Sequence, residues 1–273
     1  MESDPRPQTL IEQLQRRCAE LERELEALRE RQQQRLAVAA IVHRSLLPRP
    51  VRHERVWIDV RYVPVEQIGG DYCQVRFSDQ VTCYITMCDV TGHDVAAALL
   101  ATRISSEVRY GILYRRDPVE IVRSLERFTG EYFSETGLLL SFVAARIDLE
   151  RMELTWSGAG HPSPLLIRQK TREVECLKSQ HGLIGMGLIE ADGFHQDTVA
   201  LRSGDRLFFL TDGVLEVFDA QQRQLGFAGF TEVAKSTMDC EFSQVADQVL
   251  QAVRQYQYGP NTDDQTLIVA DIR

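Results

Sequence analysis

The chain has 273 residues, of which 44% are hydrophobic and 26% are charged, and its formal net charge is −9 at pH 7. This length and apolar content suit one sizeable core with an extension, and the acidic balance disfavours nucleic acid, which requires a basic surface. We find no apolar stretch of the roughly 18 residues that span a membrane, no signal-peptide pattern at the start and no Cys-x-x-Cys pair, so we expect a cytoplasmic protein that binds neither nucleic acid nor membrane.

Residues 1–50 predict one charged helix followed by a linker. Apolar residues recur at alternating spacings of three and four, as at the a and d positions of a coiled coil, with Glu and Arg between them. This narrow seam favours a homodimer, and the alternative is an amphipathic helix packed on its own catalytic domain. Pro48 and Pro50 end the helix. The seam residues are Ile11, Leu14, Cys18, Leu21, Leu25 and Leu28.

Residues 51–273 predict one domain of short strands and paired helices. Strands are expected at 56–63, 81–89, 138–149, 152–156, 165–167, 174–177, 197–201, 206–210 and 267–272. Helices are expected at 94–110, 118–133, 226–235 and 243–256, and Asp117 followed by Pro118 is a typical helix start. Hairpins grouped apart from paired helices indicate the α+β class.

Acidic residues stand at four points where an apolar strand meets a glycine or another acid. A carboxylate at the end of a buried strand is costly unless a cation or several donors satisfy it. Oxygen ligands without a Cys/His cluster suit Mg²⁺ or Mn²⁺. Any one of these acids alone is better explained by a turn or a helix cap than by catalysis, but the set together favours a two-metal hydrolase site. The residues are Asp71, Asp89, Asp212 and the pair Asp263 and Asp264.

Five motifs contain these acids or lie between them. They are Gly-Gly-Asp at 69–71, Cys-Asp-Val-Thr-Gly-His at 88–93, Gly-Ala-Gly-His-Pro at 158–162, Thr-Asp-Gly-Val-Leu-Glu at 211–216 and Asp-Asp-Gln-Thr at 263–266. In this order they resemble the motifs of the SpoIIE/RsbU-type bacterial phosphatases, metal-dependent serine/threonine protein phosphatases of the PPM class. The resemblance covers about residues 36–273. It implies a four-layer α-β-β-α sandwich with two antiparallel sheets in residues 51–273, preceded by the coiled-coil helix, with the metals at one edge.

The resemblance also implies a role for each acid. Asp89 would bridge two Mn²⁺ or Mg²⁺ ions. Asp212 and Asp263 would join it on one ion, and Asp71 and the backbone carbonyl of Val90 would hold the other. A water between the ions would attack the phosphoryl group, so no covalent intermediate is required.

Several positions near these motifs leave alternatives open. His93 either donates a proton to the leaving oxygen or is an exposed turn residue, and whether Asp263 or Asp264 is the ligand is not decided. Gln74 and Asp94 replace an Asp and a Gly that family members often carry, which puts the level of activity in doubt. Arg61 and Arg103 are candidates to bind the substrate phosphate.

The function that the resemblance implies is hydrolysis of phosphoserine or phosphothreonine on a STAS-domain anti-sigma-factor antagonist, in bacterial partner-switching and stress-response regulation. An upstream activator would act at the N-terminal helix. Two alternatives are a catalytically weak relative that serves as a dimeric binding or scaffold module, and an enzyme that acts on a small phosphorylated metabolite.

Overall fold

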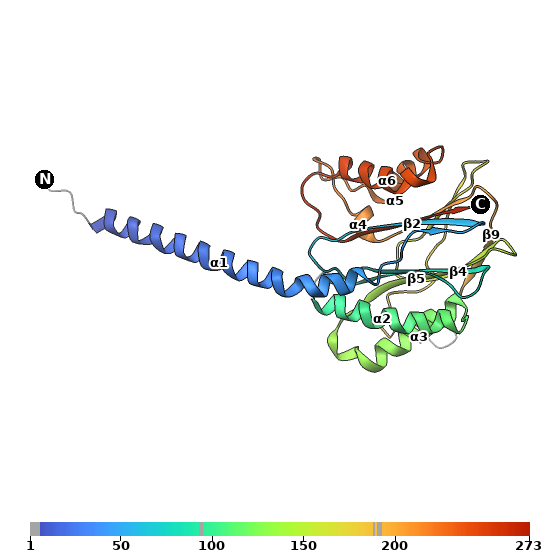
Figure 1. The fold of residues 1–273 in the computed structure, drawn as a ribbon, viewed down its shortest axis with the longest axis horizontal. Helices are drawn as coiled ribbons and strands as arrows, with labels where there is room; N and C mark the ends of the chain where they lie inside the picture. The colour runs from blue at the N-terminus through green and yellow to red at the C-terminus, as the bar shows by residue number, and fades with distance from the viewer. Residues whose placement is uncertain (1–5, 93–94, 188, 190–192) are drawn as a thin grey trace. The chain divides into compact units, whose positions relative to one another are not determined.

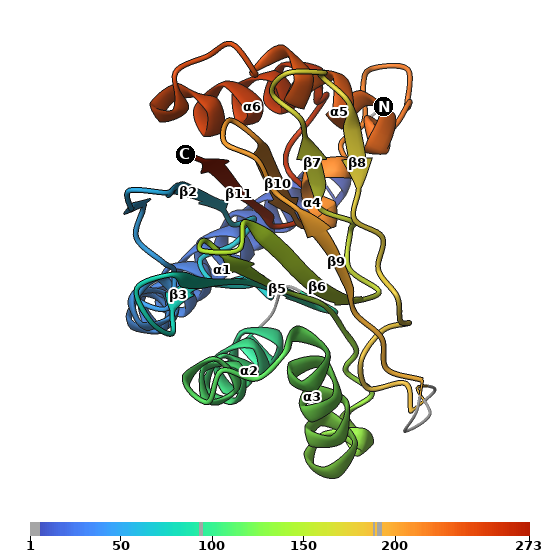
Figure 2. The ribbon, with the colours of Figure 1, turned by 90° about the vertical axis from the view of Figure 1, so that its right-hand side faces the viewer.

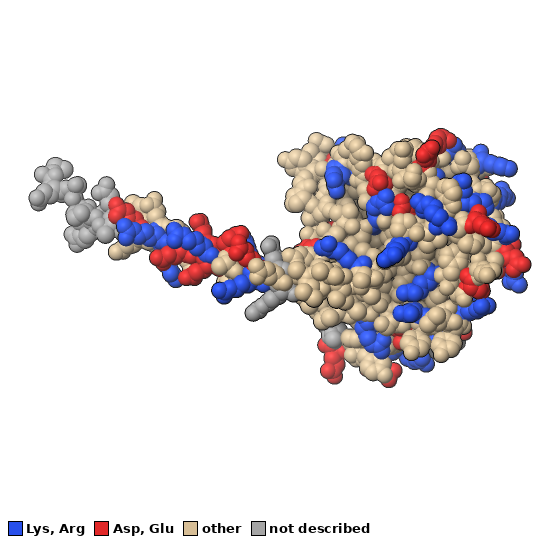
Figure 3. Space-filling model, viewed as in Figure 1, with Lys and Arg blue, Asp and Glu red and all other residues tan. Residues whose placement is uncertain are grey.

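The computed structural model describes residues 6–92, 95–187, 189 and 193–273, and the chain divides into two compact units, 1–42 and 43–273. Helix α1 (Arg6–Arg44) is one unbroken helix of 39 residues (Figure 1), and all but its last two residues belong to the first unit. Its seam residues are exposed, with Ile11 at 53% and Leu28 at 61%. Basic and acidic side chains cover much of the rest of its surface (Figure 3). The predicted helix is therefore confirmed, and the coiled coil stays a prediction.

The second unit contains two antiparallel sheets. The six-stranded sheet has the order β1-β2-β11-β10-β7-β8, and the five-stranded sheet has the order β3-β4-β5-β6-β9. The first consists of β1 (Val51–Arg52), β2 (Val56–Val63), β7 (Leu165–Ile167), β8 (Val174–Cys176), β10 (Arg206–Leu210) and β11 (Gln265–Ile272). The second consists of β3 (Tyr72–Phe77), β4 (Thr82–Val90), β5 (Leu140–Asp148), β6 (Glu153–Ala159) and β9 (Asp197–Ala200).

Helices cover the outer face of each sheet, which gives the four layers visible in Figures 1 and 2. Helices α2 (Val95–Leu113) and α3 (Pro118–Tyr132) pack on the five-stranded sheet, and α5 (Gly226–Ser236) and α6 (Phe242–Tyr256) pack on the six-stranded sheet. Two short helices, η1 (Ser134–Thr136) and α4 (Asp212–Leu215), complete the described elements. The expected α-β-β-α sandwich is confirmed.

Three apolar cores separate the four layers, and strand periodicity assigns side chains to them. On β4, Cys83, Ile85 and Met87 point into the core between the sheets, whereas Tyr84 and Cys88 point toward α2 and α3. Both faces of the central strands are covered, so strand β11 is buried at all of its positions. This explains why the strand sequences read as nearly continuous apolar runs.

Two strands were not predicted. Strand β3 (Tyr72–Phe77) follows directly on the Gly-Gly-Asp motif with no separate turn before it, and β1 (Val51–Arg52) contains only two residues. Among the described residues, no helix is both long and apolar enough to cross a lipid bilayer.

Candidate active site

The predicted acids meet at one edge of the sandwich because neighbouring antiparallel strands place the start of one beside the end of the next. In the five-stranded sheet Tyr72 pairs with Cys88, which brings Asp71 beside Asp89. In the six-stranded sheet Leu210 pairs with Leu267, which brings Asp212 to the residues that precede β11. Asp71 and the pair at 263–264 directly precede β3 and β11, whereas Asp89 lies near the end of β4 and Asp212 follows β10.

Asp71 is fully buried and is held by two threonine hydroxyls from the other sheet. Thr211 Oγ1 donates to Asp71 Oδ2 at 2.8 Å, and Thr266 Oγ1 donates to the same oxygen at 2.5 Å. The backbone N–H of Thr266 also donates to Thr211 Oγ1 at 3.0 Å, which fixes that hydroxyl in turn. Burial and the neighbouring Asp89 raise the pKa of Asp71 well above its usual range, despite these two hydrogen bonds. The network links the two sheets.

Asp89 and Asp212 repel each other and further acids. Burial raises the pKa of Asp89 to about 7, and the charges of Asp212, Asp263 and then Asp264 add to this effect. Burial, Asp263 and Glu216 raise the pKa of Asp212 to about 6. Carboxylates whose main influences are burial and other carboxylates require either protons or a bound cation.

Glycines allow the backbone to approach the acids closely. A Cβ atom at Gly70 would lie 2.6 Å from the carbonyl oxygen of Val90, so this predicted ligand oxygen faces the residue before Asp71. A Cβ atom at Gly213 would lie 2.1 Å from the carbonyl oxygen of Asp264. Only glycine fits at these two positions, which explains the Gly-Gly-Asp and Asp-Gly motifs.

The two adjacent acids at 263–264 have different surroundings. The buried carboxylate of Asp264 accepts hydrogen bonds from the backbone N–H groups of Val65 and Gly70, at 2.8 and 2.9 Å. Asp263 is half-buried, and its Oδ1 accepts one hydrogen bond from the N–H of Asp264. The side chain of Asp263 therefore has more oxygen capacity left for an ion. Glu216, which was not predicted as a site residue, is exposed and close enough to raise the pKa of both Asp89 and Asp212.

The two histidines of the motifs differ in what can be said of them. His93, the predicted proton donor, lies outside the described residues, as does Asp94. His161 is buried, and its Nδ1 lies 2.8 Å from Ser141 Oγ. Burial lowers the pKa of His161 to about 3, so its ring is neutral at physiological pH. A neutral, enclosed imidazole fits a structural role at this turn.

The polar residues considered for the substrate phosphate or a metal-bound water are engaged elsewhere. The Arg61 guanidinium donates to Asp59 at 2.8 Å and to Asp247 at 2.6 Å. The Arg103 guanidinium lies over the ring of Phe128, 4.5 Å from its centroid. Buried Gln74 donates from Nε2 to the backbone carbonyl of Ser105 in α2, which gives it a packing role.

The acids fit a divalent cation by their chemistry, although their side chains do not converge on a single point. Among residues 6–92, 95–187, 189 and 193–273, no three His, Cys, Asp or Glu side chains lie closely enough together to hold an ion as they stand. The hard oxygen donors and the mutual repulsion of the carboxylates suit Mn²⁺ or Mg²⁺.

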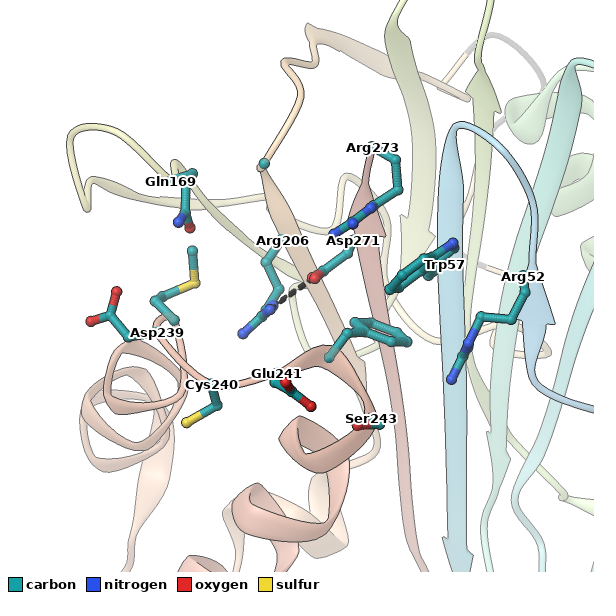
Figure 4. Close-up of a pocket in the computed structure, with 13 residues that line it drawn as sticks. Arg52, Trp57, Gln169, Arg206, Asp239, Cys240, Glu241, Ser243, Asp271 and Arg273 are labelled. Carbon is teal, nitrogen blue, oxygen red and sulfur yellow. Dashed lines mark hydrogen bonds and ion pairs between the residues drawn. The ribbon is translucent and has the colours of Figure 1, made fainter.

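A cavity of about 600 Å³ lies away from these acids, at the other end of β11 (Figure 4). Arg206 in its wall forms a double ion pair with Asp271, at 2.5 and 2.8 Å. Three arginines and three acidic residues line this cavity, so the charge of its wall favours neither an anion nor a cation. A second cavity of about 430 Å³ adjoins Asp212 and Glu216 and is also lined by Pro162 and Phe227. The second cavity is therefore the one beside the candidate metal ligands.

Comparison with known proteins agrees with this geometry. The family described as Stage II sporulation protein E (SpoIIE) matches residues 79–273, a range that includes Asp89, Asp212 and Asp263. The chain is 22% identical over 242 residues to the phosphoserine phosphatase RsbP of Bacillus subtilis (strain 168). The matched region covers 87% of this chain and 58% of RsbP, so the chain spans little more than half the length of that relative.

Solved structures share the fold at low sequence identity. The SiaA-PP2C domain of Pseudomonas aeruginosa superposes with a TM-score of 0.80 at 21% identity, over 90% of this chain and 99% of that one. The RsbU and RsbW domains of Rv1364c from Mycobacterium tuberculosis give 0.69 at 24% identity, over 82% and 61%. The catalytic domain of the serine/threonine phosphatase PstP, in complex with two manganese ions, gives 0.57 at 12% identity, over 80% and 98%. The family match covers well over half of the sequence, and we conclude that the chain belongs to the SpoIIE family.

Proposed function

We propose that the protein is a metal-dependent serine/threonine phosphoprotein phosphatase. The observation that carries the proposal is the meeting of Asp71, Asp89, Asp212 and Asp263 at one edge of the sandwich, where burial and mutual repulsion raise the pKa values of the first three. Family membership and the likeness to RsbP, a phosphoserine phosphatase, support the same reaction.

Within this proposal, Asp89, Asp212 and Asp263 would hold one Mn²⁺ or Mg²⁺ ion. Asp89, Asp71 and the backbone carbonyl of Val90 would hold a second. Two such ions, when bound, lower the pKa of a water nucleophile and neutralise the charge of the phosphoryl group. The manganese complex of PstP, which shares the fold, supports this choice of metal.

The protein's own residues position these groups. The hydroxyls of Thr211 and Thr266 orient Asp71, and the absent side chain of Gly70 lets the loop approach Val90. Mutation of such a supporting residue commonly weakens metal affinity by about 10- to 100-fold. His93 as a proton donor to the leaving oxygen remains part of the proposal.

The substrate that we propose is a phosphoserine or phosphothreonine on a partner protein, namely a STAS-domain antagonist of an anti-sigma factor. The cavity beside Asp212 offers both the apolar ring of Phe227 and the charge of Glu216 to residues next to the phosphorylated one. The RsbU-like solved structure carries an RsbW domain in the same protein, which supports a role in partner switching. All six cysteines are free thiols, which fits the cytoplasm as the place of action.

Hydrolysis of an aryl phosphate with and without Mn²⁺ tests the activity. We expect Mn²⁺-dependent turnover that Asp89→Asn reduces by at least about 100-fold, more than the loss typical of a supporting residue. Asp239→Asn is the matched control, because Asp239 is exposed and lines the other cavity. Turnover of a phosphorylated STAS-domain protein well above that of small phosphorylated metabolites would support the substrate class. A wild-type chain without turnover on any of these substrates would favour the binding-module alternative.

We also propose that α1 pairs with a second copy and receives the signal of an upstream activator. The support is the exposed apolar seam, which includes Leu14 at 57% and Leu25 at 49% exposure. Light scattering on the full chain and on a chain that starts at Val51 tests this. A monomer at tens of micromolar, or unchanged turnover after removal of residues 1–50, would contradict it.

A further inference from the structure

The carboxylate of Asp264 anchors the loop that carries Asp71. Residues 64–71 connect β2 to β3, and Asp264 accepts hydrogen bonds from two of their backbone N–H groups, those of Val65 and Gly70. Asp264 is only 3% exposed, so water does not compete for these bonds. The loop is therefore tied to the start of β11 at two points, the second of them directly before Asp71.

The loop has no room to move toward its anchor. A Cβ atom at Gly69 would lie 1.8 Å from Asp264 Oδ2 and 2.5 Å from the Tyr62 hydroxyl. On the other side, a Cβ atom at Gly70 would collide with the carbonyl oxygen of Val90. The two glycines are thus clamped between Asp264 and a candidate ligand atom, and a shift of Asp264 would shift Asp71.

Behind this clamp lie Tyr62 and His43, two buried polar side chains that the proposed reaction does not use. Their rings are 5.9 Å apart, and His43 is 4% exposed. Among the described residues, neither nitrogen of His43 has a hydrogen-bond partner, and the Tyr62 hydroxyl has at most a weak hydrogen bond from the backbone of Gly69. Buried polar atoms without partners cost stability, so their presence requires an explanation.

The proximity of both side chains to Asp264 offers an explanation for their burial. His43 stands in the last turn of α1 and belongs to the unit formed by residues 43–273. The charge of Asp264 acts on both His43 and Tyr62, which places all three within electrostatic reach of one another. The Tyr62 hydroxyl and Asp264 Oδ2 both lie beside Gly69, and the His43 ring lies beside that of Tyr62, so the three side chains form one path that ends at the Asp71 loop.

We propose that Asp264 is a positioning residue which sets the place of Asp71, and that Tyr62 and His43 support Asp264 from behind. The inference rests on the proposed metal site, and it assigns the adjacent acids Asp263 and Asp264 to different tasks. Asp263 acts as a ligand, and Asp264 holds the ligand loop.

The first test compares Asp264→Asn with Asp263→Asn in the full chain. Asparagine at 264 keeps one acceptor but turns an amide N–H₂ toward the second backbone donor. We expect the Mn²⁺ concentration for half-maximal activity to rise by about 10- to 100-fold, while turnover at saturating Mn²⁺ stays within about threefold of wild type. For Asp263→Asn we expect a loss of turnover that saturating Mn²⁺ does not restore. Equal behaviour of the two variants, or an unchanged Mn²⁺ requirement in Asp264→Asn, would overturn the inference.

The second test does not depend on whether Asp264→Asn folds. Tyr62→Phe and His43→Ala each remove one step of the path, and Tyr84→Phe is the matched control because its hydroxyl donates to Arg116 in another part of the domain. Calorimetry with Mn²⁺ alone should show weaker binding, by about threefold or more, in the first two variants and unchanged binding in the control. The double variant with both Tyr62→Phe and His43→Ala should lose less Mn²⁺-binding free energy than the sum of the losses in the two single variants, since both residues lie on one path.

The outcomes separate this inference from the proposed function. A wild-type chain that binds Mn²⁺ but hydrolyses no phosphate ester would refute the phosphatase, while the binding measurements would still decide on Tyr62 and His43. Unchanged Mn²⁺ binding in Tyr62→Phe and His43→Ala, or additive losses of binding free energy in the double variant, would overturn the proposed path. A wild-type chain that binds no Mn²⁺ would overturn both the path and the metal-dependent phosphatase.

Discussion

The pH dependence of metal-induced stabilisation follows from the raised pKa values of Asp89 and Asp212. Their pKa values are about 7 and about 6, against 3.8 for an unperturbed aspartate. Between these values the folded protein binds protons that the unfolded chain has released, so without metal the free energy of unfolding decreases as pH rises from about 4 to 7. Protons compete with the metal ion for the same carboxylate oxygens. The affinity for the metal therefore increases as pH rises through the upper part of that pH range.

The size of the effect can be worked out from the two values. Between pH 6 and pH 8, proton competition falls about tenfold at Asp89 and about twofold at Asp212. The combined factor of about 20 corresponds to about 2 kcal/mol of additional stabilisation when the ion is in excess. For a domain of this size, that is an increase of about 4–8 °C in the metal-induced shift of Tm.

Differential scanning calorimetry at pH 6 and pH 8, each with and without excess Mg²⁺ or Mn²⁺, measures this quantity. The relevant number is the difference between the two metal-induced shifts, which removes the pH dependence of the metal-free protein. In Asp89→Asn, where no proton competes at that position, the difference should be smaller than in wild type. A metal-induced shift of equal size at both pH values in wild type, or a larger one at pH 6, would refute the assignment of these two carboxylates.

Three further predictions concern other parts of the chain. Thr266→Val removes a hydrogen bond to Asp71 and should weaken Mn²⁺ binding by about 10- to 100-fold in calorimetry, with little change in circular dichroism. Arg206→Met leaves Asp271 buried without its partner and should lower the free energy of unfolding by about 3–5 kcal/mol in urea titration, whereas the double change of both residues to apolar ones should recover most of that loss. Cys18 lies in the predicted seam, so mild oxidation should give a disulfide-linked dimer on a non-reducing gel if the helices pair in parallel and in register; a chain that stays monomeric under oxidation would argue against that pairing.

The strands and helices of residues 51–273 followed closely from local patterns. Strands β2, β7 and β10 begin and end at the predicted residues, because an apolar run between turn residues is a local property of the sequence. Strand β3 was missed since it continues from the Gly-Gly-Asp motif without a break. The sequence likewise predicted α1, but its exposed seam shows only that the face is available for pairing.

The acids of the candidate site were recognised from sequence because each belongs to a short motif at the end of a strand. Their relation to one another was decided by the tertiary structure. Pairing of antiparallel strands brings Asp71 to Asp89, and the threonines at the ends of β10 and β11 reach across to Asp71 from the other sheet. No local pattern encodes such contacts between distant segments.

The sequence by itself determined most of the strands, the helices that cover the sheets and the set of candidate ligands, because periodicity and motif spacing are properties of neighbouring residues. The different surroundings of Asp263 and Asp264 and the proximity of Glu216 were decided only by the tertiary structure. So was the pairing of Arg61 with Asp59 and Asp247, which engages a residue considered for phosphate binding. The physical reason is that burial, hydrogen bonds and charge repulsion depend on which segments pack together, and two adjacent aspartates of the same chemistry differ only in what the fold places around them.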